Sequence, residues 1–259
     1  MGGLLRPDEG DPVIVVNENG QSPVVLVCEH AGKVIPRALG DMGLSSEDLM
    51  RHIAWDIGAE AMARGLAEAL DAPLLLQRYS RLAYDCNRPP ESPDAMPKMS
   101  ETTRVPGNEQ LSAEDRLARI REIYRPFHDR VARLLDARAA LGVTSLFVTL
   151  HSFTPIYKGV RRTLDLGILH DHDTRLADDL LAAFGGARDI VVRRNEPYGP
   201  KDGVCHTLNL HAAPRGLPYA MLEIRNDLIA RSAGQEQWAK RLSEVLGALP
   251  VTQARRVAS

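Results

Sequence analysis

The sequence predicts an α/β protein, in which helices cover both faces of one mixed, mostly parallel sheet in a three-layer α/β/α arrangement. Six short apolar runs lack a clean alternation of polar and apolar residues, which is typical of strands buried on both faces. Amphipathic helical patterns lie between these runs, and alternating strands and helices favour this layered fold. We expect one domain over residues 1–259, with its core at about residues 23–246.

The six apolar runs are the predicted strands of the sheet. In chain order they are PVVLVC (23–28), APLLLQ (72–77), TSLFVTL (144–150), TLDLGIL (163–169), RDIVVRR (188–194) and PYAMLEI (218–224). Most are rich in Val, Ile and Leu and are short enough for strands.

Four segments with apolar residues at helical spacing are the predicted helices. They are residues 47–70, with Ser45 or Ser46 as N-cap, and residues 113–141, 173–185 and 234–249. Ser112 to Asp115 resembles a capping box that opens the second of them, and Pro126 should kink or divide that helix.

One long irregular segment, rich in Pro, Ser and Glu, extends from Asn87 to Ser112. Irregular segments of this length inside a domain are usually functional lids or disordered. We therefore predict a long loop or lid over residues 89–112.

The composition is that of an ordinary globular protein, with 44% hydrophobic and 25% charged residues. A net charge of −2 gives no general attraction for nucleic acid or anionic lipid, and no apolar run is long enough for a membrane span. Three widely separated cysteines, Cys28, Cys86 and Cys205, fit a reducing compartment. We predict a cytoplasmic protein with a small-molecule partner, and the sequence does not predict its oligomeric state.

Polar residues stand where several of the predicted strands end. Glu29 and His30 follow the first run, His151 follows the third, and Glu223 lies near the end of the last. In open α/β sheets, ligands bind beyond the carboxyl ends of strands. Two imidazoles and one carboxylate are common ligands of catalytic zinc, and a further carboxylate could transfer protons.

Simpler interpretations stay open at this point. A histidine at a strand end is often only a hydrogen-bonded structural residue, and the charged residues could form bracing ion pairs. The sequence has no HExxH motif and no GxSxG motif. Ser152 directly follows His151, and Cys28 lies inside an apolar run, so a serine or cysteine nucleophile is disfavoured.

A set of segments resembles the N-formylglutamate amidohydrolase family in order along the chain. These are CEHAGKVIP, IAWDIGAEAMARGLAEAL, YSRLAYDCNRPP, IYRPFHDRV, VTLHSFTP and YAMLEIRNDLI, within residues 23–246. That family is similar to zinc carboxypeptidases and aspartoacylases. The resemblance implies a phosphorylase/hydrolase-like fold and zinc-dependent hydrolysis of linear amides, although another divalent metal remains open.

The resemblance also implies roles for the metal ligands. His30, Asp56 and His151 correspond to the ligands of the ion. Glu29 stands where related enzymes commonly have Pro, so it is a second candidate for the carboxylate ligand. Adjacent strand residues point to opposite faces, which favours Asp56 over Glu29 as the partner of His30.

The remaining roles concern proton transfer and substrate binding. The resemblance implies that Glu223 is the general base, and that Arg88 with Asn87 binds a substrate carboxylate. The other residues predicted to bind substrate, or to support Arg88, are Arg81, Asp85, His206 and Arg225. We expect His128 to be structural, and His52, His170 and His172 to lie at the surface or around the site.

The expected function is that of a metal-dependent amidohydrolase acting on an N-acylated acidic amino acid such as N-formyl-L-glutamate. Two alternatives remain. The chain could be a non-catalytic relative that binds an acidic amino-acid derivative, or a deacylase with the same chemistry and a different acyl group.

Overall fold

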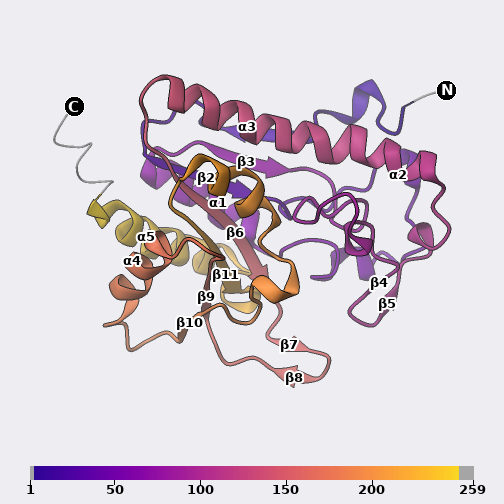
Figure 1. Ribbon diagram of the computed structural model, residues 1–259. Helices are drawn as coiled ribbons and strands as arrows, with labels where there is room; N and C mark the ends of the chain where they lie inside the picture. Colours follow the sequence, from indigo (N-terminus) through magenta and orange to yellow (C-terminus); the bar gives the residue numbers. More distant parts are fainter. Residues whose placement is uncertain (1–2, 251–259) are drawn as a thin grey trace.

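The computed structural model describes residues 3–250, and it has a central sheet with helices on both faces (Figure 1). The two ends of the predicted domain, residues 1–2 and 251–259, lie outside the described residues.

The sheet has seven strands in the order β1-β3-β2-β6-β11-β9-β10. Their bounds are β1 Val13–Val16, β2 Val24–Cys28, β3 Leu74–Gln77, β6 Leu146–Phe153, β9 Leu166–Leu169, β10 Val192–Arg194 and β11 Tyr219–Arg225. Strands β3, β2, β6 and β11 are parallel, whereas β1 and β9 each pair antiparallel with their neighbours β3 and β11. The predicted mixed, mostly parallel sheet is confirmed, and all six predicted runs form strands.

Strand β2 shows why the fold has three layers. Val24 and Leu26 belong to one buried cluster, and Val25 and Val27 belong to another on the opposite face. Because side chains of a strand alternate between faces, a continuous apolar run requires cover on both sides.

The described residues form five α-helices: α1 Ala59–Leu70, α2 Ala113–Arg119, α3 Arg125–Ala140, α4 Arg175–Phe184 and α5 Ser232–Ala248. All of them except α2 supply that cover. Apolar residues of α1, α4 and α5 pack in the cluster with Val24, and those of α3 pack in the cluster with Val25 (Figure 1). None of the helices in the described part of the chain is long and apolar enough to cross a membrane.

The helix predicted over residues 47–70 begins only at Ala59, so its first half is wrong. Gly58 has a φ of 80°, and a Cβ atom there would lie 2.0 Å from the carbonyl oxygen of Ile229. The chain therefore enters the helix through a left-handed glycine that packs against a distant segment. The Ser45 hydroxyl accepts from the amide of Asp48 at 3.0 Å, where only the short 3₁₀ turn Asp48–Met50 begins. As a result, Asp56 lies in a loop rather than on a helix.

The helix predicted over residues 113–141 is divided, as Pro126 indicated. Ser112 and Asp115 form the predicted capping box at the start of α2. A π turn, Ile120–Tyr124, separates α2 from α3, and Pro126 lies in the first turn of α3. Proline has no N–H to donate, so the regular hydrogen-bond ladder cannot continue through it.

Two small hairpins lie outside the main sheet. The first, β4 Met99–Ser100 with β5 Thr103–Arg104, is in the segment predicted as a loop or lid. The second, β7 Ile156–Tyr157 with β8 Val160–Arg161, follows directly after β6.

Buried Arg119 holds both ends of the segment that carries the β4–β5 hairpin. Its guanidinium donates to the carbonyl oxygens of Ala83 at 3.0 Å and Gly107 at 3.2 Å, and to Oδ1 of Asn108 at 2.6 Å. Asn108 in turn donates to the carbonyl oxygens of Leu82 and Pro97. One cation thus ties both ends of the segment to α2.

We predict that Arg119→Met lowers the free energy of unfolding by about 2–4 kcal/mol, because it leaves several buried acceptors without a donor. Urea unfolding measures the change. Arg121→Met is the matched control, since the Arg121 side chain is 63% exposed and its loss should change stability by less than about 0.5 kcal/mol. Equal losses in the two variants would contradict the anchoring role.

Candidate functional site

The carboxyl ends of β2, β6 and β11 bring three polar side chains to one edge of the sheet. Val27 lies opposite Thr149 and His151 lies opposite Glu223 in the parallel register. Since side chains alternate along each strand, Glu29, His151 and Glu223 fall on the same face at neighbouring positions.

The turn after β2 explains the small residues that follow His30. The amide of Gly32 donates to the carbonyl oxygen of Gln77 at 2.9 Å. A Cβ atom at Gly32 would lie 1.8 Å from the carbonyl oxygen of Arg78, so only glycine fits this approach. The turn therefore packs against the segment after β3 and brings His30 next to Asp85.

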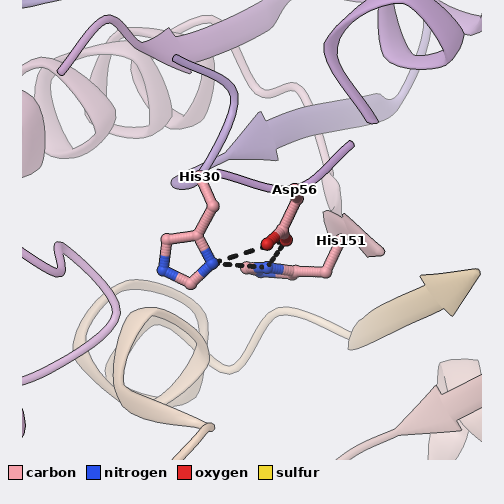
Figure 2. Close-up of side chains that lie close together, drawn as sticks. All are labelled: His30, Asp56 and His151. Carbon is pink, nitrogen blue, oxygen red and sulfur yellow. Dashed lines mark hydrogen bonds and ion pairs between the residues drawn. The ribbon is translucent and has the colours of Figure 1, made fainter. Parts of the chain in front are cut away.

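Three buried side chains, His30, Asp56 and His151, converge on one point (Figure 2). The Nδ1 atoms of the two histidines lie 3.2 Å apart. Oδ2 of Asp56 lies 3.4 Å from Nδ1 of His30 and 2.9 Å from Nδ1 of His151. Ligand atoms about 2.0–2.1 Å from a tetrahedral zinc ion lie about 3.3–3.4 Å from one another. The spacing of the three atoms therefore fits a small tetrahedral cation.

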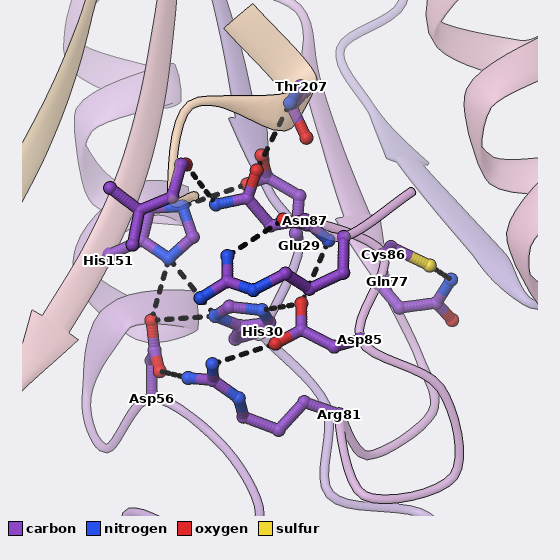
Figure 3. A network of polar contacts seen from close by, with 12 residues as sticks. Glu29, His30, Asp56, Gln77, Arg81, Asp85, Cys86, Asn87, His151 and Thr207 are labelled. Carbon is purple, nitrogen blue, oxygen red and sulfur yellow. Dashed lines mark hydrogen bonds and ion pairs between the residues drawn. The ribbon is translucent and has the colours of Figure 1, made fainter. Parts of the chain in front are cut away.

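Buried carboxylates hold the far nitrogen of each imidazole (Figure 3). Asp85 Oδ1 lies 2.7 Å from Nε2 of His30, and Glu29 Oε2 lies 3.1 Å from Nε2 of His151. Such contacts keep the proton on Nε2 and leave Nδ1 to face the centre. Glu29, the alternative carboxylate ligand, thus contacts the far nitrogen of His151. The carboxylate that lies between the Nδ1 atoms of the two histidines is Asp56.

Arg81 bridges two of these carboxylates. Its guanidinium lies 3.4 Å from Oδ1 of Asp56 and 2.8 Å from Oδ2 of Asp85. Burial alone would raise the pKa of Asp85, but His30 and Arg81 hold it well below its usual value. Burial would also raise the pKa of Asp56, but His30 and His151 outweigh it and lower this pKa. Arg81 and Asp85 therefore support the ligand group, and Asp85 also accepts from the backbone amides of Asn87 at 2.9 Å and Arg88 at 3.0 Å.

Glu223 is buried beside this group and faces a cavity. Its Oε2 atom has no hydrogen-bond partner among residues 3–250. Burial raises the pKa of Glu223 to about 7. A carboxylate with a free oxygen in such a place is suited to proton transfer.

The cavity has a volume of about 430 Å³ and opens over His30, Asp56, His151 and Glu223. Three segments outside the sheet complete its walls: residues 100–101 in the predicted lid, residues 157–162 in and after the second hairpin, and residues 197–204. Arg81, Asn87, Arg88, His52 and Ser152 also line it. The Ser152 hydroxyl donates to the carbonyl oxygen of Ile57, so it is already engaged.

Arg88 lies on the wall of the cavity, and Asn87 holds that wall in place. The side-chain amide of Asn87 donates to the carbonyl oxygen of Val204 at 2.6 Å and accepts from the amide of Thr207 at 3.1 Å. Nη1 of Arg88 donates to the carbonyl oxygens of Asn87 and Gly203. Both polar atoms of the Asn87 side chain therefore contact the protein, and Arg88 has further nitrogens left for a ligand.

Three of the predicted substrate-binding residues do not line the cavity: Asp85, which holds His30, and His206 and Arg225. His206 faces the hydroxyl of Tyr124, 2.9 Å from its Nε2. Arg225 pairs with Asp165 and Asp227 at 2.8 Å each, so its charge is already balanced.

His128 is structural, as its place in α3 suggested. It is buried, and its Nδ1 lies 2.8 Å from Nε2 of His211 while its Nε2 donates to the carbonyl oxygen of Cys86 at 2.8 Å. The two imidazoles stack in the layer between α3 and the sheet.

Comparison with known families identifies the chain. The description N-formylglutamate amidohydrolase belongs to the family profile that matches residues 22–230. The chain belongs to this family. A comparison with curated proteins found no match.

Two solved structures are similar to this N-formylglutamate amidohydrolase family member over nearly the whole chain. A gene product of Agrobacterium tumefaciens is 50% identical, with a TM-score of 0.93 over 98% of this chain and 99% of that one. An N-formylglutamate amidohydrolase from Ralstonia eutropha JMP134 is 19% identical, with a TM-score of 0.69 over 96% of this chain and 100% of that one, which shows a shared fold.

Several cavity residues of this family member have no signal in the sequence. Glu101, Tyr157, Arg162 and Tyr198 line the cavity from loops and hairpin ends, where no periodicity marks them. Only the pair of basic residues in the stretch YKGVRR, next to a short turn, could have drawn attention to Arg162.

We predict that the His128–His211 pair makes this N-formylglutamate amidohydrolase family member acid-labile. Burial lowers the pKa of His128 to about 3 and that of His211 to about 4, below the value of about 6.5 in an unfolded chain. Stability is therefore complete above about pH 6.5, and each histidine reduces it by up to about 1.4 kcal/mol per pH unit as the pH falls.

Chemical unfolding at several pH values measures this slope. His128→Gln should lower the slope below pH 6.5 by up to about half, whereas His172→Gln should not, because His172 is 95% exposed. Identical slopes in the wild type and both variants would exclude the pair as the cause.

Proposed function

We propose that the protein is a metal-dependent amidohydrolase that cleaves the linear amide of an N-acylated, carboxylate-bearing amino acid such as N-formyl-L-glutamate. The observation that carries this proposal is the convergence of His30 Nδ1, His151 Nδ1 and Asp56 Oδ2 at the spacing of metal ligands. Family membership supports the same reaction class.

His30, Asp56 and His151 would hold the ion, and zinc is the metal we propose. Two neutral imidazoles and one carboxylate are a common zinc donor set, although other divalent ions accept the same donors. A bound divalent ion supplies acidification of water and polarisation of a carbonyl oxygen. Asp85 and Glu29 would fix the two imidazoles, and Arg81 would limit the repulsion between Asp56 and Asp85.

Glu223 would move the proton during hydrolysis. Glu223 lines the cavity, and its carboxylate can accept a proton from the attacking water as the new C–O bond forms. The same carboxyl group then delivers that proton to the amide nitrogen as the C–N bond breaks. The products are the free amine of the amino acid and the carboxylate of the acyl group, which is formate for a formyl substrate.

Arg88 would orient the substrate through its carboxylate. Its contacts with the carbonyl oxygens of Asn87 and Gly203 fix one edge of the guanidinium and leave other donors toward the cavity. We place the enzyme in the cytoplasm, since Cys28, Cys86 and Cys205 are all unpaired and buried.

We predict that the purified protein binds one zinc ion per chain, and that His151→Asn reduces the zinc affinity by roughly 100-fold or more, because it removes one of three protein ligands. Calorimetric titration of the metal-free protein measures this. His172→Asn, at an exposed position, should bind zinc as the wild type does. A wild type that binds no divalent metal would refute the proposed mechanism.

We predict that Glu223→Gln lowers kcat for formate release from N-formyl-L-glutamate by roughly 100- to 10,000-fold and leaves zinc binding intact, because it removes the proton carrier and no ligand. The control is Glu236→Gln, an exposed residue of α5. Unchanged turnover in Glu223→Gln would exclude this residue as the base. A wild type that binds zinc and releases no formate would instead indicate the non-catalytic relative.

A further inference from the structure

The cavity contains an arginine that the proposed reaction does not yet use. Arg162 follows the hairpin β7–β8, which is the continuation of the strand that carries His151. Its guanidinium lies 5.7 Å from the ring centre of Phe153. Phe153 is two positions after His151 on the same face of β6, and Arg162 lines the same cavity as His151.

Aromatic side chains hold the Arg162 guanidinium in one orientation. It lies 4.5 Å from the ring centre of Tyr157 and 4.8 Å from that of Tyr198, distances at which cation–π attraction operates. Nη1 also donates to the hydroxyl of Tyr198 at 2.9 Å. Because the rings and this hydrogen bond restrict the side chain, little further entropy is lost when a ligand binds to its remaining donors.

Arg162 shares the cavity with Glu101, Asp202 and Glu223 but is paired with none of them. In the part of the chain from residue 3 to residue 250, Arg162 forms no ion pair, and its Nε and Nη2 atoms have no hydrogen-bond acceptor. The contrast is Arg81, which lines the same cavity but is bound to Asp56 and Asp85. A partly buried guanidinium with free donors is a site for a carboxylate or phosphate group.

Arg88 and Arg162 reach the cavity from different segments. Arg88 follows β3 and is fixed to Gly203, whereas Arg162 follows β8 and is fixed to Tyr198. Each of them keeps nitrogen donors that could bind a carboxylate. A substrate with two carboxylates could engage both while its amide lies at the ligand group.

We propose that Arg162 determines substrate specificity by binding a second carboxylate, so that N-acyl amino acids with an acidic side chain are preferred over neutral analogues of the same shape. This inference rests on the proposed function, in which Arg88 binds the other carboxylate. A site built around a charged hydrogen bond discriminates strongly against a ligand that cannot complete it.

The first test compares N-formyl-L-glutamate with N-formyl-L-glutamine, which has a neutral amide in place of the side-chain carboxylate. The wild type should prefer the glutamate derivative in kcat/KM. Arg162→Met should lower kcat/KM for that derivative by roughly 10- to 100-fold, mainly through KM, and should change the value for the glutamine derivative by less than about threefold. Arg162→Lys, which keeps the charge without the fork, should recover part of the loss.

The adjacent Arg161 provides a matched control. It is exposed and does not line the cavity, so Arg161→Met should behave as the wild type with both substrates. An equal loss for both substrates in Arg162→Met would mean that the residue only supports the cavity wall, and the proposal would be overturned. A wild type that shows no preference would overturn it as well.

The second test separates this proposal from the proposed function. Calorimetry measures the binding of L-glutamate and L-glutamine to the zinc-loaded protein, with no turnover required. The wild type should bind L-glutamate more tightly, and Arg162→Met should abolish that difference while Arg161→Met retains it. If formate is not released but this difference is present and depends on Arg162, the specificity role stands and the hydrolase function fails. If L-glutamate binds no better than L-glutamine, the specificity role fails whatever the activity.

Discussion

The parallel register of β2, β6 and β11 is the constraint on which the site depends. It places Glu29, His151 and Glu223 at neighbouring positions on one face of the sheet. Each of the three then takes a direction that the strand dictates: Glu29 to the far side of the His151 ring, His151 to the centre, and Glu223 to the cavity. A shift of one residue in any of these strands would turn its polar side chain into the apolar layer on the other face. The apolar runs before these residues therefore determine the positions of the three polar side chains as well as the packing of the core.

The second feature is the balance of charge around the ligand group. Asp56 and Asp85 are ionised and buried, as is Glu29, and Arg81 is the one permanent cation within 4 Å of their carboxylates among the described residues. Burying charge is costly unless an opposite charge compensates it. Glu29 and Asp56 raise the pKa of His151 well above its usual value although burial opposes this, so the group attracts a positive charge. Either a proton on His151 or a metal ion at its Nδ1 would compensate the negative charge of the buried carboxylates. Because the two compete for Nδ1, metal binding would depend on pH.

The sequence predicted the sheet well because strands follow from local pattern, whereas Asp56 was named as a ligand only through the family resemblance. Apolar runs locate strands, and the residues after a run lie at the edge of the sheet, so His30 and His151 were candidates before any coordinates. The start of α1 could not be predicted, since Gly58 adopts its conformation through a contact with Ile229, more than 170 residues further along the chain. His206 and Arg225 failed for a related reason: each finds a partner, Tyr124 or Asp165, whose proximity only the tertiary fold creates. Arg162 and Tyr198 lie on irregular segments, where composition carries no positional information.

Residues at strand ends and residues in loops have different roles in the site. The ligand group and Glu223 come mainly from strand ends, whose positions the core fixes, whereas the walls that would meet the substrate come from hairpins and loops. Glu101 joins two of those walls, because its carboxylate accepts from Arg51 at 3.0 Å and from the backbone amide of Lys158 at 3.2 Å. The segment from the predicted lid and the hairpin that leads to Arg162 are therefore mechanically linked above the buried ligands. Loops tolerate change better than strands, so a family that keeps the strand ends can alter its walls and acquire a different substrate without disturbing the metal ligands.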